Sequence, residues 1–136
     1  MDTLENIEAK FNKWVLPTAI VPTGGTYAQG VSAVITTTTA VEVIAAPAAG
    51  NHLVIQRVFA LNFTAAEIGA LMLIDATPTD LALLFLGDPA IADQGRGSIM
   101  FPAGLVCASA KAFEAKGLIA AKGDMHVYAD GYTIAD

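Results

Sequence analysis

The stretch from Gly50 to Phe63, GNHLVIQRVFALNF, decides how this chain folds. It follows the turn-forming residues 47–51, PAAGN, and is rich in branched and aromatic side chains that favour strands. Because side chains of a strand alternate between two faces, one set is predicted to face the core and the other to face outward. The predicted core set is Leu53, Ile55, Phe59, Leu61 and Phe63, and the predicted outward set is His52, Val54, Gln56, Val58 and Asn62.

Arg57 interrupts the apolar row of this strand. A charge at such a position marks a bulge, a sheet edge or a salt bridge to an acidic partner. If the chain assembles with copies of itself, we expect that acidic partner on a neighbouring chain.

The segments around this strand predict an all-β fold. Short apolar runs rich in Val, Ile, Leu and Thr alternate with turn signals. Strands are predicted over 31–39, 41–45, 67–75, 80–86, 98–101, within 105–114, over 118–121 and over 125–134, and a loop is predicted over 88–97. Strands at this spacing are typical of an antiparallel β-sandwich or jelly roll. We therefore expect a sandwich domain over residues 31–136.

Residues 1–30 are predicted to form an N-terminal arm that carries a short helix. Residues 2–14 open with a capping-box pattern and place four apolar side chains at helical spacing, Leu4, Ile7, Phe11 and Trp14. A helix this short needs a surface to pack on, and two surfaces stay open: its own domain or a neighbouring subunit. Residues 15–30 contain prolines and glycines and no charge, so we expect an extended segment that lies along a surface.

The composition favours a protein that assembles with partners. Hydrophobic residues make up 54% of the chain and charged residues 15%, where about 25% is usual. Between Trp14 and Ala66 the charged residues are Glu42 and Arg57 alone. An exposed surface so poor in charge suggests covering by a partner or by copies of the same chain. The alternative is a soluble monomer coated with Thr, Ala, Asn and Gln.

Charge and hydropathy argue against nucleic acid and membrane partners. The net charge is −6, and the 7 basic residues are scattered rather than clustered. No run of about 18 apolar residues predicts a membrane span, and the acidic N-terminus does not resemble a signal peptide. The one cysteine, Cys107, has no partner for an internal disulfide, and we expect it to be a small buried apolar residue.

The sequence predicts no catalytic, cofactor-binding or metal site, and we expect that the protein is not an enzyme. His52 and His126 lie in predicted strands without Cys or acidic residues at metal-ligand spacing. They offer no arrangement of nucleophile, base and orienting acid. Calcium is conceivable where four acids gather around two turns, but their spacing matches no calcium loop, so solvated loops are expected. These acids are Asp75, Asp80, Asp88 and Asp93.

Residues 45–134 resemble the small β-sandwich structural proteins of tailed bacteriophages. The shared features are a turn ending in Ala49-Gly50 before the long apolar strand and the segment FPAGL at 101–105. An Ala-rich strand at 111–115 and a closing strand from His126 that ends in Gly131-Tyr132 complete the likeness. Residues 1–44 carry no part of this resemblance.

The resemblance implies a structural virion protein, most often a homotrimeric capsid decoration (cement) protein that stabilises the phage head by bridging capsid subunits. The implied partners are copies of the chain and the major capsid protein, at the capsid surface of a particle made in the host cytoplasm. The alternative is a receptor- or glycan-binding module of a head or tail appendage. The residues expected to contact partners are Leu4, Ile7, Phe11, Trp14, Ile20, Val21, Tyr27 and Arg57.

Overall fold

The computed structural model describes residues 20–64, 69–76, 80–88, 90, 95–118 and 124–136. Within these ranges the chain forms strands, turns and loops and no helix. No helix able to cross a membrane is found in the described residues. The strands are β1 (Thr26–Val31), β2 (Val41–Ile44), β3 (Asn51–Asn62), β4 (Gly69–Asp75), β5 (Asp80–Leu86), β6 (Arg96–Val106), β7 (Phe113–Gly117) and β8 (Met125–Ala135).

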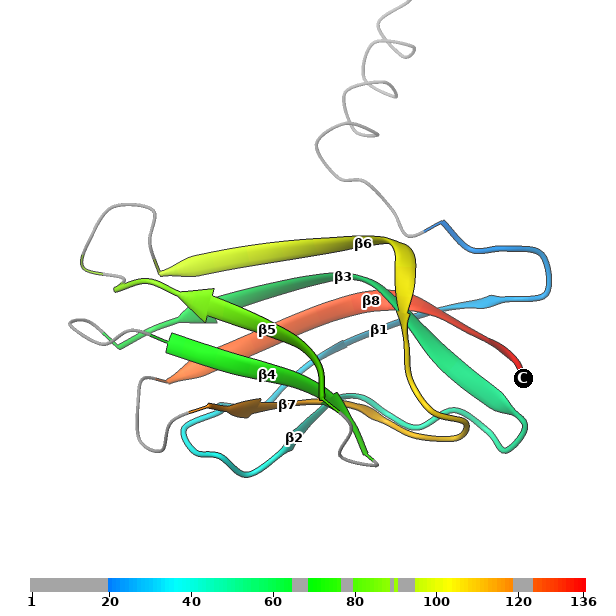
Figure 1. Cartoon of the computed structure of the whole chain (residues 1–136), viewed down its shortest axis with the longest axis horizontal. Coiled ribbons are helices and arrows are strands. Elements are labelled where there is room, and N and C mark those ends of the chain that lie inside the picture. Colours follow the sequence, from blue (N-terminus) through cyan, green and yellow to red (C-terminus); the bar gives the residue numbers. More distant parts are fainter. Residues whose placement is uncertain (1–19, 65–68, 77–79, 89, 91–94, 119–123) are drawn as a thin grey trace, which may run out of the picture.

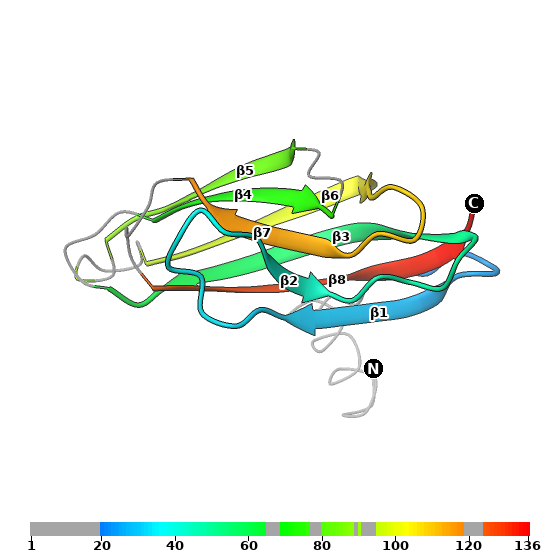
Figure 2. The same cartoon turned by 90° about the horizontal axis from the view of Figure 1, so that it is seen from below.

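The eight strands form two four-stranded sheets in which all neighbouring strands are antiparallel. Sheet A has the order β1-β8-β3-β6, and sheet B has the order β2-β7-β4-β5. The sheets lie one over the other as two layers (Figure 1 and Figure 2). The core between the layers draws on both sheets, with Leu53, Ile55 and Val58 from β3 and Leu71 and Leu73 from β4.

Several predicted strands are confirmed. The stretch that begins at Gly50 forms β3, which lies between β8 and β6 and is therefore a central strand. The predicted strands at 41–45, 80–86 and 125–134 match β2, β5 and β8, and the described part of 67–75 matches β4. These segments share an apolar face that sheet packing can bury, which is the property that the alternation detects.

The predicted facing of β3 is correct up to Ile55 and wrong beyond it. The register shifts between Ile55 and Arg57 in the pairing of β3 with both β6 and β8. A bulge adds one residue, and one extra residue turns every later side chain to the opposite face. Phe59 and Phe63, predicted to lie in the core, are 40% and 59% exposed. The residues buried in their place are Val58, Ala60 and Asn62.

The region around β6 differs from the prediction, because β6 begins at Arg96, inside the range 88–97 that was predicted to be a loop. A short strand at 98–101 was expected to end at Pro102, but β6 runs through Pro102 to Val106. Because β6 is an edge strand of sheet A, the missing N–H of a proline removes no bond to a further strand. The strand expected within 105–114 is divided: residues 105–106 end β6, and β7 begins at Phe113 after a turn. The strand predicted at 118–121 begins with a bend at Leu118, and its other residues lie outside the described residues.

The N-terminal part of the sheet also begins earlier than expected. The predicted boundary between arm and sandwich at residue 30 falls inside β1, whose residues all pair with β8. The strand predicted over 31–39 is wrong: Val31 is the last residue of β1, and of the residues after it only Ile35 pairs, in a single bridge to Met125. The Thr37 hydroxyl accepts a hydrogen bond from the Thr39 N–H, a local turn that competes with strand formation. The predicted helix at 2–14 lies outside the described residues.

Candidate functional site

The outer face of sheet A carries six exposed large apolar or aromatic side chains. We call this surface face A, defined by Tyr27, Val31, Phe59, Phe63, Met100 and Val106. The registers place Val31, Tyr128 and Phe59 in one row across β1, β8 and β3. Their inward neighbours, such as Val58 and Ala129, belong to the core. Face A is therefore the solvent side of sheet A and spans all four of its strands.

A buried carboxylate lies at the centre of face A. Asp130 of β8 is 0% exposed and stands opposite Arg57 of β3. The Arg57 Nε lies 2.9 Å from Asp130 Oδ1 and 2.8 Å from Oδ2, and Arg57 Nη2 lies 2.7 Å from Oδ2. The hydrogen bond to Asp130 raises the pKa of Arg57 above its ordinary value. This short contact through two guanidinium nitrogens satisfies both carboxylate oxygens of the buried Asp130.

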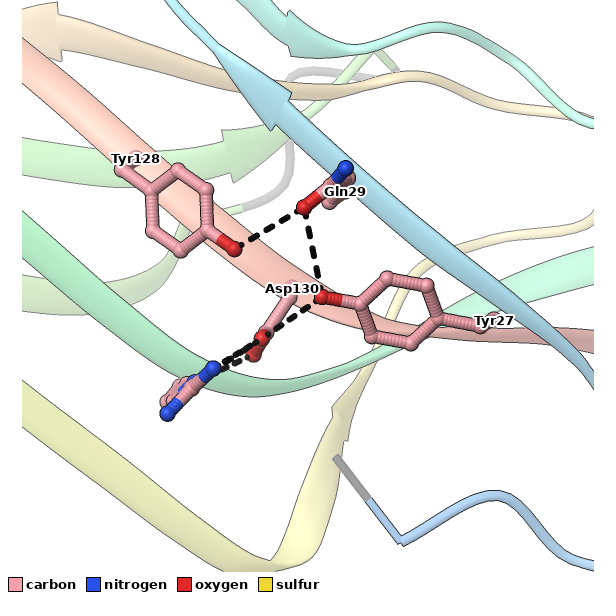
Figure 3. A network of polar contacts seen from close by, with 5 residues as sticks. Tyr27, Gln29, Tyr128 and Asp130 are labelled. Carbon is pink, nitrogen blue, oxygen red and sulfur yellow. Dashed lines mark hydrogen bonds and ion pairs between the residues drawn. The ribbon is translucent and has the colours of Figure 1, made fainter. Parts of the chain in front are cut away.

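Three further polar side chains extend this cluster across β8 to β1 (Figure 3). The Tyr27 hydroxyl donates to Asp130 Oδ2 at 3.1 Å and lies 3.3 Å from Gln29 Oε1. The Tyr128 hydroxyl donates to the same Gln29 oxygen at 3.1 Å. The neighbouring Tyr128 hydroxyl, partial burial and the Asp130 carboxylate together raise the pKa of Tyr27. The cluster therefore joins side chains of β1, β8 and β3.

Arg57 thus has an acidic partner, but that partner is in its own chain. The expectation of a partner on a neighbouring chain is wrong, because Asp130 is the residue that pairs with Arg57 across the β3–β8 ladder. Of the three possibilities for Arg57, the bulge and the salt bridge are confirmed, and the sheet edge is excluded by the central position of β3. The sequence signal for the pair was available: one charge stands inside each of two long apolar strands.

The described chain enters the fold beside face A. The Gln56 Nε2 donates to the Ile20 carbonyl at 2.7 Å, and the Ile20 side chain is 80% exposed. The oxygen of the same amide, Gln56 Oε1, is buried and has no hydrogen-bond donor in the described part of the chain. Val21 is exposed next to Ile20. The structure therefore brings four expected contact residues to the region of face A: Ile20, Val21, Tyr27 and Arg57. The other four, Leu4, Ile7, Phe11 and Trp14, lie outside the described residues.

Sheet B has a second exposed apolar surface. We call it face B, defined by Leu83, Phe85 and Leu118. Phe85 of the edge strand β5 pairs with Ala70 of β4, and the Leu118 N–H donates to the Ala70 carbonyl at 2.9 Å. Leu84, between the two exposed residues of β5, faces the core. Face B therefore lies on the side of the molecule opposite to face A.

A serine, an acid and a histidine meet near the C-terminus without forming a nucleophilic site. The His52 Nδ1 lies 2.9 Å from Asp136 Oδ1, and the Ser109 hydroxyl donates to Asp136 Oδ2. A catalytic serine must bond to the imidazole that removes its proton, whereas here the carboxylate separates the two groups. The hydrogen bonds from Ser109 and then from His52 lower the pKa of Asp136. The cluster fastens the end of β8 to the start of β3.

One of the four acids expected in solvated loops is buried instead. Asp75 at the end of β4 is 2% exposed, and its Oδ2 accepts the Ala108 N–H at 3.0 Å. The carboxylate is needed there because it accepts a backbone N–H from the turn before β7. Cys107, the residue before Ala108, is buried in the core, as predicted. Its burial is the main cause that raises the pKa of its thiol to about 12, and the negative charge of Asp75 adds to it. The described residues hold no group of three or more His, Cys, Asp or Glu placed to bind a metal ion.

Comparison with protein-family models, with curated proteins and with solved structures finds no match to this chain.

Proposed function

We propose that this chain is a structural virion protein, a homotrimeric capsid decoration protein of a tailed bacteriophage. The observation that carries the proposal is that both outer faces of the two-layer fold expose large apolar side chains. Monomeric proteins seldom leave contiguous apolar patches of more than a few hundred Å² uncovered, and larger patches mark interaction sites. The resemblance of residues 45–134 to phage structural proteins supports a phage capsid as the assembly in question.

The position of the two faces supports assembly over a single binding event. Face A and face B lie on opposite sides of the molecule, so a partner that covers one leaves the other free. Burial of apolar surface contributes about 25 cal/mol per Å², and closed symmetric assembly repeats each contact. A subunit with two such faces can bind a copy of itself through one and a capsid surface through the other.

We also infer that the two sheets form a jelly roll. The chain changes sheet at each connection between described strands except from β4 to β5. This alternation supports the eight-stranded double-sheet arrangement built from two Greek keys. Such a rigid body suits a protein whose role is to bridge other subunits.

The proposal is tested by light scattering and by capsid binding. We expect the purified full chain to be a trimer and to bind assembled capsids that lack a decoration protein. Phe85→Glu places a charge in face B, where the Phe85 side chain is 64% exposed, and should weaken trimer formation or capsid binding. Thr38→Glu adds the same charge in an exposed loop and should change neither. A monodisperse monomer that does not bind capsids would refute the proposal.

A second function is favoured by one observation on face A. The rings of Tyr27 and Tyr128 lie beside the exposed polar side chain of Gln29 (Figure 3). Aromatic faces next to hydrogen-bonding groups are suited to binding sugars. A glycan array would detect this activity, and loss of its signals in Tyr27→Ala would place the sugar on face A. Capsid binding without any glycan signal would leave the decoration role as the function.

A further inference from the structure

We propose that the open edge of β1 binds the β1 strand of a second copy, so that the A sheets of the two molecules join across a two-fold axis. This inference goes beyond the decoration role, because a two-fold contact joins copies in pairs and is not the contact that would hold three copies together. It rests on the direction of the backbone groups of β1, on the side chains beside them and on the distribution of charge.

Half of the backbone groups of β1 point away from the rest of sheet A. β1 is an edge strand, and the N–H of Ser32, just beyond it, donates to the Val127 carbonyl at 2.8 Å. Because the C=O and N–H of a trans peptide point in opposite directions, the Val31 carbonyl points away from β8. The direction alternates along a strand, so the N–H and C=O groups of Tyr27, Gln29 and Val31 lie on the open edge. In the part of the chain that the structure describes, no hydrogen bond engages these groups.

A second β1 strand offers the same backbone groups in matching positions. When the two strands run antiparallel with Gln29 opposite Gln29 of the second copy, Tyr27 of each copy lies opposite Val31 of the other. Each of these pairs exchanges two hydrogen bonds, so every outward N–H and C=O of both strands gains a partner. The edge is therefore complementary to itself, as a two-fold contact requires.

The side chains of β1 suit this register on both sides of the sheet. On face A, the ring of Tyr27, 44% exposed, meets the β-branched side chain of Val31, 64% exposed, of the other copy. On the inner side, Ala28 stands opposite Gly30 of the other copy. Small residues fit there because the two sheets approach closely at β1: a Cβ on Gly30 would lie 1.9 Å from the Val43 carbonyl oxygen of β2.

Charge and strand composition favour β1 over the other edge strands for a contact between copies. The net charge of −6 makes copies repel each other, but residues 15–41 carry no charge. Strand edges that avoid pairing are short or carry charges, prolines or bulges. β2 has 4 residues and includes Glu42, β6 contains Pro102, and β5 begins at Asp80 beside a register shift. β1 has 6 residues and contains no charge, no proline and no register shift.

The contact between two β1 strands is small. Each hydrogen bond across it replaces one to water, so the pairing adds little net free energy beyond the cost of association. Copies are therefore expected to pair at high protein concentration, or where an assembly already holds them side by side. In a dilute sample the β1 edge stays open.

Amide hydrogen exchange tests the edge without any substitution. In dilute protein we expect the amides of Tyr27, Gln29 and Val31 to exchange rapidly, and those of Ala28 and Gly30, which point to β8, to exchange slowly. A higher protein concentration should slow the first set several-fold and leave the second set unchanged. Slow exchange of the first set in dilute monomers would show that the same chain covers this edge and would overturn the inference.

Disulfide cross-linking under mild oxidation tests the register. In the proposed pairing the Cα atoms of the two Gln29 residues are about 5.5 Å apart, within the range that a disulfide spans. Gln29→Cys should therefore form linked dimers several-fold faster than Ser98→Cys, the matched control at an exposed position of the edge strand β6. In a mixture, Tyr27→Cys and Val31→Cys chains should link to each other faster than either links to itself.

Capsid binding by the same samples separates this inference from the decoration role. Cross-linking of Gln29→Cys no faster than that of Ser98→Cys, or rapid exchange of the outward amides at every protein concentration, would overturn the inference. A trimer that still binds capsids would then keep the decoration role. Dimers linked through Gln29→Cys, from a protein that does not bind capsids, would refute the decoration role and leave this inference standing.

Discussion

At the scale of single residues, Asp130 and Arg57 are the pair on which the outer side of sheet A depends. The Asp130 carboxylate is fully buried, and a buried charge is tolerated when its partners replace the lost water. Arg57 supplies most of that replacement, and the Tyr27 hydroxyl adds a third donor group. The pair therefore specifies which residues of β3 and β8 stand opposite each other, more than it adds net stability.

Removal of the arginine should be far more damaging than removal of the tyrosine hydroxyl. Arg57→Met leaves Asp130 buried without a cation, which typically costs about 3–5 kcal/mol, and the 29% exposure of the Arg57 side chain places the cost near the lower end. Tyr27→Phe removes one hydrogen bond and should cost about 1 kcal/mol. Urea denaturation of both variants measures the difference. Equal losses would show that Asp130 does not depend on the guanidinium.

The side-chain carboxylate of Asp136 makes the stability of the fold depend on pH, with a sign that follows from its pKa shift. The pKa of Asp136 is lowered in the folded chain, first by Ser109 and then by His52. Its stabilising contribution is therefore present above the pKa of the unfolded chain and is lost as the pH falls through the folded value. We expect Ser109→Ala to raise the pKa of Asp136 toward its ordinary value in a carboxyl-carbon NMR titration. Ser98→Ala, in the exposed face of β6, is the control, and a similar rise there would contradict this assignment.

At the scale of elements, the bulge of β3 depends on a glycine in its neighbour. A Cβ on Gly131 of β8 would lie 1.9 Å from the Val54 carbonyl oxygen and 2.9 Å from the Ile55 Cα. These atoms stand directly before the register shift of β3. The backbones approach so closely that a side chain cannot be inserted without moving one strand. Gly131 therefore permits the bulge that turns Phe59 outward.

Gly131→Ala should destabilise the fold strongly. The obstacle is backbone, which cannot rotate away, so we expect a loss of several kcal/mol or no folded protein. Gly97→Ala is the matched control in β6, because its Cβ would meet the end of the flexible Leu86 side chain at 3.0 Å. Thermal unfolding followed by circular dichroism compares the two. A Gly131→Ala protein as stable as Gly97→Ala would mean that the bulge does not need this close approach.

The alternation of side chains predicted individual strands better than it predicted how the strands pair and where they lie in a sheet. β5 and β8 follow from their own residues, because a buried face leaves a local pattern. The bulge at Gln56 does not, since it depends on Gly131, which is distant in sequence. The strand through Pro102 was missed for the same reason: a proline is acceptable there because β6 is an edge, and edges are set by strand order.

For the candidate site, too, single residues were predicted but the contacts between them were not. Tyr27 was expected to contact a partner as part of the uncharged segment 15–30, and Arg57 because its charge interrupts an apolar row. Their common partner Asp130 was not predicted, because the contact exists through the β1–β8 and β3–β8 registers. One charge inside each of two apolar strands could have suggested the Arg57–Asp130 pair, but no local pattern indicated that Tyr27 of β1 would join it.

At the scale of the whole molecule, net charge opposes the association that the apolar faces favour. The chain carries 13 acidic and 7 basic residues, and its sequence pI is about 4.6. Repulsion between copies therefore weakens as carboxylates become protonated, while the apolar area of face B stays unchanged. Above neutral pH, repulsion between the negatively charged copies opposes the attraction between their apolar faces. Below neutral pH, this repulsion is weaker, so assembly is favoured.

We therefore expect the average mass in solution to rise as the pH falls from about 7.5 toward the sequence pI, and to rise also with added salt, which screens the same repulsion. Static light scattering at fixed protein concentration measures both trends. Phe85→Ser removes an exposed ring from face B without changing the net charge, so its mass should respond much less to either change. Thr38→Ser, in an exposed loop, should behave as the unaltered chain does. An unchanged mass across this pH range, or an equal response of Phe85→Ser, would show that face B does not drive association, and the contacts of the assembly would then have to be sought at the edge strands β5 and β6.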